Sequence, residues 1–412
     1  MLHRILCTIF LTLVVSTPAR GDSEASESAA ALVLRHCSPC HGGDGAAPLR
    51  LDSFDRLLRN RQLARLLIED GTMPPSIALD SGNGLLTTRR LRTDDRATLL
   101  SALATRASAM EAFKSLTTIA PNSLVPSVLL EPERPWTIGA AGGAQIRTFF
   151  AATDAQRVRG VRFAQPGTQA PIRLLTLAAD PRRTLRQLEA RLVSNTAPPA
   201  DGGGIEAMGN IGLVPSGALG GLSLVQPRFE LPAGFCFEVP AGDLAIETTS
   251  EPIGRAVEVL PTLAWIPARK EDARAVRAIA MPAVALLVKA DTCASMTLTH
   301  TIAADVDVVA ILVKGGAFLR SVEFEVQSTD EHRRATPLLT VPDFRMAFAE
   351  PWVFTRAVRV GAGSILRARL GFDNTADNPQ QPSRPTLEVR SGLPPLGEDT
   401  MVVVLVADAV SR

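Results

Sequence analysis

The chain has 412 residues, enough for two or three domains, with 46% hydrophobic and 21% charged residues. This is the balance of an ordinary soluble globular protein. The formal net charge is +1, so the composition gives no reason to expect nucleic acid or an anionic membrane surface as a partner.

Residues 1–20, MLHRILCTIFLTLVVSTPAR, have the pattern of a secretory signal peptide. A short basic start precedes an apolar run over residues 5–15, and residues 17–19 offer a small-residue cleavage site. The run is too short to span a bilayer comfortably, although an uncleaved anchor stays an alternative. No later segment has about 18 continuous apolar residues. We therefore expect an exported, periplasmic protein without stable membrane insertion.

Residues 27–115 have the apolar spacing of a small helical domain. Apolar residues recur at three- and four-residue intervals in four segments, 29–37, 51–60, 61–70 and 93–110. Thr93 is a suitable N-cap for the last of them, and Asp94 and Asp95 favour the positive end of its dipole.

A cluster of cysteine and histidine lies in this helical region, where residues 35–43 read RHCSPCHGG. C-x-x-C-H is the attachment sequence of a c-type haem. Two thiols at this spacing, Cys37 and Cys40, can add to the vinyl groups of one porphyrin edge, and His41 can then ligate the iron. A structural zinc site would need further ligands nearby, and a thioredoxin-like dithiol would need a βαβ unit.

The second axial ligand has one strong candidate, Met73, in the sequence GTMPPS. The two following prolines restrict the backbone, so this loop can present a thioether rigidly. A methionine that fills a gap in the core is the alternative interpretation of Met73. Met110 is a second candidate ligand but lies in a helical run, and His36 is expected to point away from the iron.

Together, HCSPCH, the short helices, TMPPS and the final helix resemble a class I cytochrome c domain over residues 27–115. The resemblance implies thioether links at Cys37 and Cys40, and His41 and Met73 as the axial ligands of one haem c. A His/Met pair raises the redox potential and suits the transfer of single electrons. An exported redox protein is the expected partner, and the oligomeric state stays open.

From about residue 120 the sequence pattern is typical of β-sandwiches. Proline and glycine separate short apolar runs such as VDVVAILV, SVEFEV and MVVVLVADAV. One helix is expected at 180–195, and the glycine-rich stretch 201–212 is expected to be a flexible loop. No nucleophile elbow, zincin helix or phosphate loop is present, and no catalytic residue is predicted.

This region is similar to the copper type II, ascorbate-dependent monooxygenases, the peptidylglycine and dopamine hydroxylase family. The similarity covers about residues 135–412 and is carried by ADVDVVAILVKGGAFLRSVEFEV, FDNTADNP and SGLPPLGEDTM. It implies two jelly-roll-like antiparallel β-sandwiches, over 125–265 and 266–412. The expected fold class is therefore multidomain α + β, a small all-α cytochrome c domain followed by two sandwiches.

The copper ligands of that family are nearly all missing here, so copper is not expected. The family uses histidines and one methionine, because copper prefers imidazole nitrogen and thioether sulfur. The positions that correspond to its ligands carry Ile172-Arg173-Leu174, then Thr248, Thr249 and Ser250, then Lys314 and Gly316, and only Met401 is retained. His300 and His332 match no ligand position and are interpreted as ordinary polar residues.

The leading hypothesis is an exported electron-transfer protein whose monooxygenase-like module has lost its metals and serves docking or assembly. The alternative is a haem-fed copper-type monooxygenase with non-standard ligands; a mainly structural partner of an exported complex is a third. Two smaller questions stay open. Cys236 and Cys293 can pair as a disulfide or be separate thiols, and FDNTADNP can be a structural turn or, less favoured, a calcium site through Asp373, Asn374, Asp377 and Asn378.

Overall fold

The structure is a computed structural model that describes residues 28–41, 49, 51, 53–74, 78–79, 84–85, 91, 93–114, 129–130, 136–140, 145–163, 172–180, 205–206, 218–223, 228–250, 254–259, 262–329, 335–345, 349, 351–392 and 397–410. The expected signal peptide at 1–20 and the expected helix at 180–195, after Asp180, lie outside these residues. So does most of the glycine-rich stretch 201–212.

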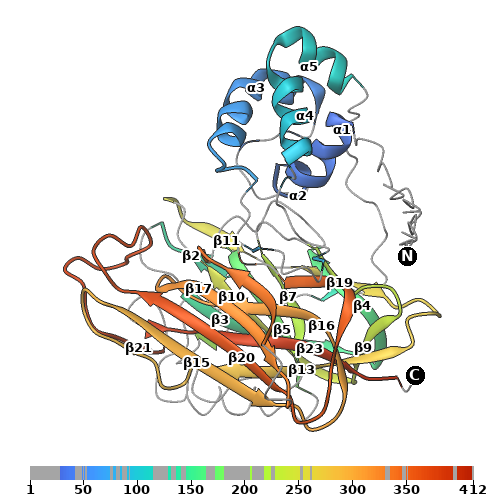
Figure 1. The fold of residues 1–412 in the computed structure, drawn as a ribbon, viewed down its shortest axis with the longest axis vertical. Coiled ribbons are helices and arrows are strands. Elements are labelled where there is room, and N and C mark those ends of the chain that lie inside the picture. Colours follow the sequence, from blue (N-terminus) through green and yellow to red (C-terminus); the bar gives the residue numbers. More distant parts are fainter. Residues whose placement is uncertain are drawn as a thin grey trace, which may run out of the picture.

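The helices that the structure describes lie in the first part of the chain, which we call the helical segment (described residues 28–114). They are α1 (Ala29–Leu32), η1 (Val33–Cys37), α2 (Ser38–His41), α3 (Phe54–Glu69), α4 (Thr93–Leu103) and α5 (Arg106–Phe113). They gather at one end of the molecule (Figure 1) and share an apolar cluster that includes Leu32, Leu57, Leu99 and Phe113. α1, η1 and α2 follow one another without a break, so the predicted helix at 29–37 continues through the C-x-x-C-H sequence.

Two helix boundaries differ from the prediction. The segments 51–60 and 61–70 form one helix, α3, which begins after Ser53, whose hydroxyl accepts a hydrogen bond from the Arg56 N–H at 3.4 Å. The predicted helix at 93–110 is interrupted, because Thr105 starts a new helix through a reciprocal capping box with Ser108.

The described part of the chain after residue 114 consists mainly of strands, and we call it the β body. The first twelve are β1 (Leu129–Leu130), β2 (Trp136–Ile138), β3 (Gln145–Thr153), β4 (Gln156–Phe163), β5 (Ile172–Asp180), β6 (Ile205–Glu206), β7 (Ala218–Ser223), β8 (Arg228–Glu230), β9 (Phe235–Val239), β10 (Gly242–Ser250), β11 (Val257–Val259) and β12 (Leu263–Pro267). The remaining strands are β13 (Arg274–Pro282), β14 (Leu287–Val288), β15 (Cys293–Thr301), β16 (Val306–Lys314), β17 (Leu319–Gln327), β18 (Thr336–Val341), β19 (Pro351–Val360), β20 (Ile365–Asp373), β21 (Val389–Ser391), β22 (Gly397–Glu398) and β23 (Met401–Asp408).

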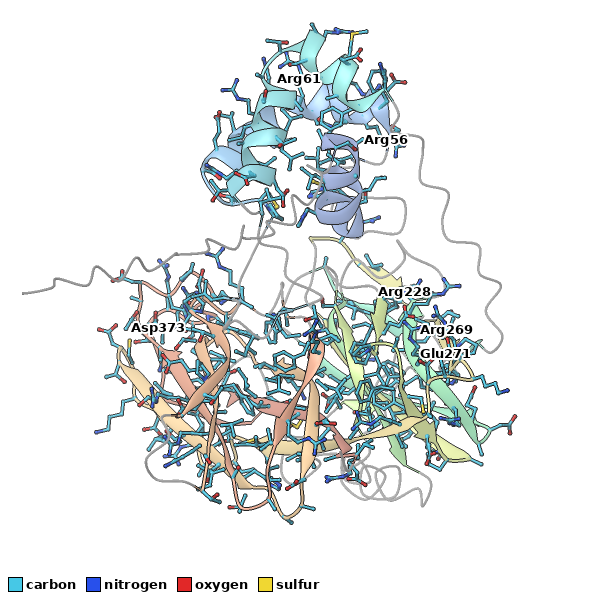
Figure 2. All side chains as sticks on the ribbon, turned by 45° about the vertical axis from the view of Figure 1, so that its right-hand side comes forward. Arg56, Arg61, Arg228, Arg269, Glu271 and Asp373 are labelled. Carbon is cyan, nitrogen blue, oxygen red and sulfur yellow. The ribbon has the colours of Figure 1, made fainter. Side chains whose placement is uncertain are left out.

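Three sheets dominate the described part of the β body. The largest has the order β1-β12-β4-β9-β13-β23-β16-β19, with β8 beside β4. A second sheet has the order β6-β3-β10-β5-β7, and a third has the order β15-β20-β17-β18. In Figure 2, Asp373 marks the side of the third sheet, Arg228 and Arg269 lie across the β body from it, and Arg56 and Arg61 lie on the helical segment.

Strands β16 and β23 form a middle layer that is buried on both faces. Every residue of β16 is buried, as is every residue of β23 except the last. Val308 and Val404 belong to the core shared with β17, β18 and β20, whereas Leu312 and Val403 belong to the core shared with β5, β7 and β10. Burial on both faces explains why these strands read as continuous apolar runs rather than as alternating ones.

The predicted fold class is wrong, and the molecule is mainly β. Of the described residues 51% lie in strands and 17% in helices, and no distinct small all-α domain is set apart. The two predicted sandwiches are not separate either, because one sheet joins strands from 125–265 (β12, β4, β9) with strands from 266–412 (β13, β23, β16). The junction is the parallel pairing of β9 with β13.

The helical segment is also tied to the β body. Leu79 forms an isolated β-bridge with Thr340 of β18, and Leu85 forms another with Phe354 of β19. Ala78 and Leu85 are buried in the core that β16 shares with the third sheet. This segment was not predicted to be extended, since it is short and has no apolar periodicity. Within the described part of the chain, no helix has the length and apolar character needed to cross a bilayer.

Candidate functional site

The C-x-x-C-H sequence is carried by the first helical unit. Ser28 caps this unit by accepting a hydrogen bond from the Ala31 N–H at 3.3 Å, and the buried Leu32 anchors it in the helical core. Cys37 is the last residue of η1 and its side chain is half-buried. Cys40 lies in the last turn of α2, and its side chain is outside the described residues. The helix thus places both cysteines within one turn of each other and of His41.

His41 has an oriented imidazole. Its Nδ1 lies 2.5 Å from the backbone carbonyl oxygen of Leu49. Because a carbonyl only accepts, this contact places the proton on Nδ1 and leaves the lone pair of Nε2 for another partner. A second bond holds the same residue, since the Leu51 N–H donates to the carbonyl of His41 at 2.8 Å. Metal-ligating histidines commonly donate one ring N–H to a carbonyl in this way and bind the metal through the other ring nitrogen.

Met73 lies in the turn that follows α3, and its side chain is half-buried. Its N–H donates to the carbonyl of Leu67 at 2.8 Å, and the Thr72 N–H donates to the Asp70 carboxylate at 2.8 Å. Arg96 of α4 reinforces this turn, since its guanidinium donates to the last carbonyls of α3, those of Ile68 and Glu69. These hydrogen bonds fix the start of the turn.

The two other candidate ligands differ in their surroundings. Met110 lies on α5 and is 49% exposed, whereas His36 is buried within η1. The donor set offered to a haem is therefore two thiols three residues apart, the Nε2 of His41 and the thioether of Met73. This set fits a c-type haem in donor chemistry. Across the described residues, no group of three or more His, Cys, Asp and Glu side chains could hold a metal ion.

The residues that the resemblance to the copper monooxygenases would place at a first copper site lie together on neighbouring strands. In the pairing of β5 with β10, Ile172 lies opposite Ser250 and Leu174 lies opposite Thr249. Ile172 and the three polar residues of β10, Thr248, Thr249 and Ser250, are buried. Thr248 uses its hydroxyl to donate to the Arg147 carbonyl at 3.3 Å. Isoleucine and short hydroxyl side chains offer no imidazole or thioether, so these residues do not fit copper.

The residues that correspond to the second copper site also lie together, because Lys314 of β16 pairs with Met401 of β23. The ammonium of Lys314 contacts the carboxylates of Glu247 on β10 and Asp399 before β23. We call these three residues the Lys314 cluster. The side chains of Lys314 and Asp399 are each 4% exposed, so the cluster is a buried set of charges. The cross-strand partner of Met401 therefore carries an ammonium, which cannot ligate a metal ion.

Charge in the Lys314 cluster is not fully balanced. Burial lowers the pKa of Lys314, but the carboxylates of Asp399 and Glu247 outweigh it and hold that pKa above its ordinary value. Burial raises the pKa of Asp399, and the ammonium offsets this only in part, since Glu247 competes for the same cation. Within the described residues the Oδ1 of Asp399 has no hydrogen-bond partner.

Gly316 could not carry a copper ligand in this structure. Its N–H donates to the Oε1 of Glu398 at 2.5 Å, and the Phe318 N–H donates to the Oε2 at 3.1 Å. A Cβ on Gly316 would lie 2.6 Å from that Oε2, closer than side chains tolerate. Burial raises the pKa of Glu398, against the hydrogen bonds from Thr400, Gly316 and Phe318. The residues present at these two positions therefore do not fit copper.

The Lys314 cluster contains two residues that the sequence did not single out, Glu247 and Asp399. Both are common acidic residues, and Glu247 is 67 positions from Lys314. The sequence signal was the charged residue at the end of an apolar strand, since a buried lysine requires an acidic partner. His300 is exposed on β15, in line with its interpretation as an ordinary polar residue, and His332 lies outside the described residues.

Cys236 and Cys293 do not form a disulfide. Cys236 is buried on β9, where its sulfur accepts a hydrogen bond from Arg157 at 3.1 Å. Cys293 is exposed at the start of β15, and its sulfur lies 3.8 Å from the Asp373 carboxylate. Burial, and then the Asp373 charge, raise the pKa of the Cys293 thiol.

The FDNTADNP segment forms a turn whose amides donate to backbone carbonyls. The Nδ2 of Asn374 donates to Leu387 at 2.7 Å and to Lys289 at 3.0 Å. The Nδ2 of Asn378 donates to Asp373 at 2.7 Å and to Ala317 at 3.0 Å. Asp373 accepts from the N–H and the hydroxyl of Thr375. These contacts are those of the structural turn that was the favoured interpretation.

Asn374→Ala should lower the free energy of unfolding by about 2 kcal/mol, because buried carbonyl oxygens lose their donor. Chemical denaturation followed by circular dichroism measures this loss. Asn60→Ala is the matched control, since the Asn60 amide makes one exposed bond on α3, and it should change stability by less than about 0.5 kcal/mol. Equal losses in the two variants would show that the turn does not depend on Asn374.

Comparisons with known proteins do not identify a family. No family model matches the sequence, and no curated protein matches it. Among solved structures, the chain is similar to the major capsid protein P2 from bacteriophage PM2, at 10% identity and a TM-score of 0.24, over 69% of this chain and 98% of that one. It is also similar to the VP2 subviral particle of infectious bursal disease virus, at 9% identity and a TM-score of 0.19, over 71% of this chain and 75% of that one. A putative alpha-L-fucosidase from Bacteroides ovatus follows at 13% identity and a TM-score of 0.15, over 76% of this chain and 44% of that one. At these scores none of the likenesses carries an argument about fold or function.

Proposed function

We propose that the protein is an exported, periplasmic one-electron carrier with one covalently attached haem c. Cys37 and Cys40 would form the thioether links, and His41 and Met73 would be the axial ligands. When bound, the haem supplies a one-electron redox couple. The observation that carries the proposal is the C-x-x-C-H sequence on a helix whose histidine already has its Nδ1 at 2.5 Å from a carbonyl oxygen.

The chain's own residues have defined tasks in this proposal. The Leu49 carbonyl holds the imidazole of His41 in the tautomer that offers Nε2. The hydrogen bonds of Met73 and Thr72 hold the methionine turn against the end of α3. In this proposal the β body serves docking or assembly with an exported redox partner. The ammonium of Lys314 and the glycine at 316 argue only against copper chemistry there.

The test is a metal and spectral analysis of the full chain, expressed in a bacterial host that can attach haem. We expect one iron and no copper for each chain, and absorption bands of a thioether-linked haem in the reduced state. Haem that organic solvent extracts would contradict the covalent link. Two tightly held copper ions together with copper-dependent oxygen consumption would instead support the monooxygenase alternative.

Met73→Ala should lower the redox potential by on the order of 0.1 V, a part of the roughly 0.8 V over which axial ligands tune haem proteins. A thioether favours ferrous iron more than water or hydroxide does, so its loss stabilises the ferric state. Spectroelectrochemical titration measures the change, and the weak far-red band of the oxidised protein should disappear. Met110→Ala is the control, because Met110 is exposed on α5. If the redox potential changed in Met110→Ala and not in Met73→Ala, Met110 rather than Met73 would be the axial ligand.

A further inference from the structure

The methionine turn and the β body are joined by a short stretch of chain. We call residues 78–79 and 84–85 the strap. Met73 lies six positions before Leu79, and six residues of extended chain span about 20 Å at most. The chain length therefore limits how far Met73 can lie from the strap. The strap is the first part of the chain after Met73 and Pro74 that the structure describes.

The strap is bonded to two strands of the β body. The Leu79 N–H donates to the Thr340 carbonyl of β18 at 2.7 Å. The Thr355 N–H of β19 donates to the Gly84 carbonyl at 3.0 Å, and the Thr355 hydroxyl reaches the same oxygen at 3.4 Å. Each end of the strap thus has its own backbone hydrogen bond to a strand.

Burial adds to these hydrogen bonds. Ala78 is 3% exposed and Leu85 is 5% exposed, and both belong to the core that contains Phe344, Trp352 and Phe354. Burial of a leucine side chain stabilises the packing that it joins. The strap is therefore part of the β body's packing, although it lies between α3 and α4 in the sequence.

The Met73 turn is consequently held from both sides. On one side the Met73 N–H bonds to Leu67 of α3, and on the other the strap is fixed to β18 and β19. From this geometry we infer that the β body positions Met73. The packing of Leu85 and the backbone hydrogen bonds of Leu79 and Gly84 keep the thioether in place for the iron, so ligation by Met73 depends on the β body. The inference rests on the proposed function, in which Met73 is a haem ligand.

Leu85→Ala in the full-length holoprotein tests the inference through two readouts. The first is the hydrogen-exchange rate of the Met73 amide, which reports on the turn whatever ligates the iron. The second is the affinity of the ferric protein for imidazole, which competes with methionine. We expect both to rise by about tenfold or more. A tenfold change corresponds to about 1.4 kcal/mol, less than a buried Leu-to-Ala substitution ordinarily costs. Leu63→Ala, at a leucine that is 48% exposed on α3, is the control and should change neither readout.

Gly84→Ala is the second variant. It is used if Leu85→Ala unfolds the protein as a whole, which a loss of hydrogen-exchange protection throughout the chain would show. Gly84 has a φ of +68°, and a Cβ there would collide with the Thr355 side chain. Gly254→Ala is its control, because Gly254 has a φ of +80° but nothing within 4 Å of an added Cβ. An alanine at either position is strained by the positive φ. A difference between the two variants in the exchange rate of the Met73 amide therefore reports the collision with Thr355 of β19.

The inference is overturned if the strap variants match their controls in both readouts. Failure of the proposed function looks different, because the wild-type ferric protein would then lack covalent haem or the far-red band of methionine ligation. In that case the exchange rate of the Met73 amide still decides whether the β body holds the turn.

Discussion

Replacing both Cys37 and Cys40 with serine should abolish the covalent attachment of haem that we propose. A hydroxyl is a far weaker nucleophile than a thiolate at neutral pH and does not add to the vinyl groups, so neither link forms. Each single variant keeps one thioether and therefore some covalent haem, at reduced yield. Haem staining after denaturing electrophoresis and the intact mass of the chain measure the attachment, and the double variant should show no stained band.

Cys293→Ser is the control for this experiment, because Cys293 is exposed on the β body at the start of β15. It should retain full haem stain and the mass of one haem. Cys236 is less suitable, since it is buried and accepts a hydrogen bond from Arg157. Stain that persists in the double variant would show that haem is held elsewhere, and loss of stain in Cys293→Ser would show a general folding defect.

The front of the chain was predictable where local signals are strong. The leucine spacing predicted α3, and Asp94 and Asp95 do lie in the first turn of α4. The break between α4 and α5 was missed, although Thr105 and Ser108 have the spacing of a capping box. The strap was missed for a different reason. A segment of four described residues that adds single bridges to distant strands carries no periodic signal of its own.

The β body was predictable strand by strand but not as a whole. The runs VDVVAILV, SVEFEV and MVVVLVADAV correspond to β16, β17 and β23. An apolar run does not reveal which layers cover its two faces, so two separate sandwiches were predicted where β16 and β23 form one shared layer. Loss of the histidines was readable from sequence, whereas the partners of Lys314 were not, because they are brought together only by the tertiary fold.

The strap and the shared layer have one consequence in common. The strap brings the Met73 turn to β18 and β19, and β19 is the direct neighbour of β16 in the largest sheet. The Lys314 cluster lies at the end of that same β16. The strap and the Lys314 cluster are therefore linked through two neighbouring strands of one sheet, β19 and β16.

Lys314→Met should be the most destabilising of the single substitutions considered, at about 3–5 kcal/mol. It leaves the carboxylates of Asp399 and Glu247 facing each other in a buried site without their cation. Methionine nearly matches the length and volume of the lysine stem, so the loss reports charge rather than a cavity. Urea denaturation followed by circular dichroism measures it. Lys289→Met, at an exposed lysine, should change stability by less than about 0.5 kcal/mol.

The loss of stability caused by Lys314→Met should also depend on pH. The pKa of Lys314 is raised in the folded state, so its contribution is fully present below the unfolded value of about 10.4 and is lost only as pH rises through the folded value. The penalty of Lys314→Met should therefore stay undiminished as the pH rises from neutral to about pH 9. At acid pH it should shrink, because burial raises the pKa of Asp399 and the uncompensated carboxylate takes up a proton.

The triple variant Lys314→Met, Glu247→Gln, Asp399→Asn should recover most of the lost stability, since no buried charge is left unpaired. If Lys314→Met were as mild as Lys289→Met, or if the triple variant were no better than the single one, the ammonium would not be what neutralises this site.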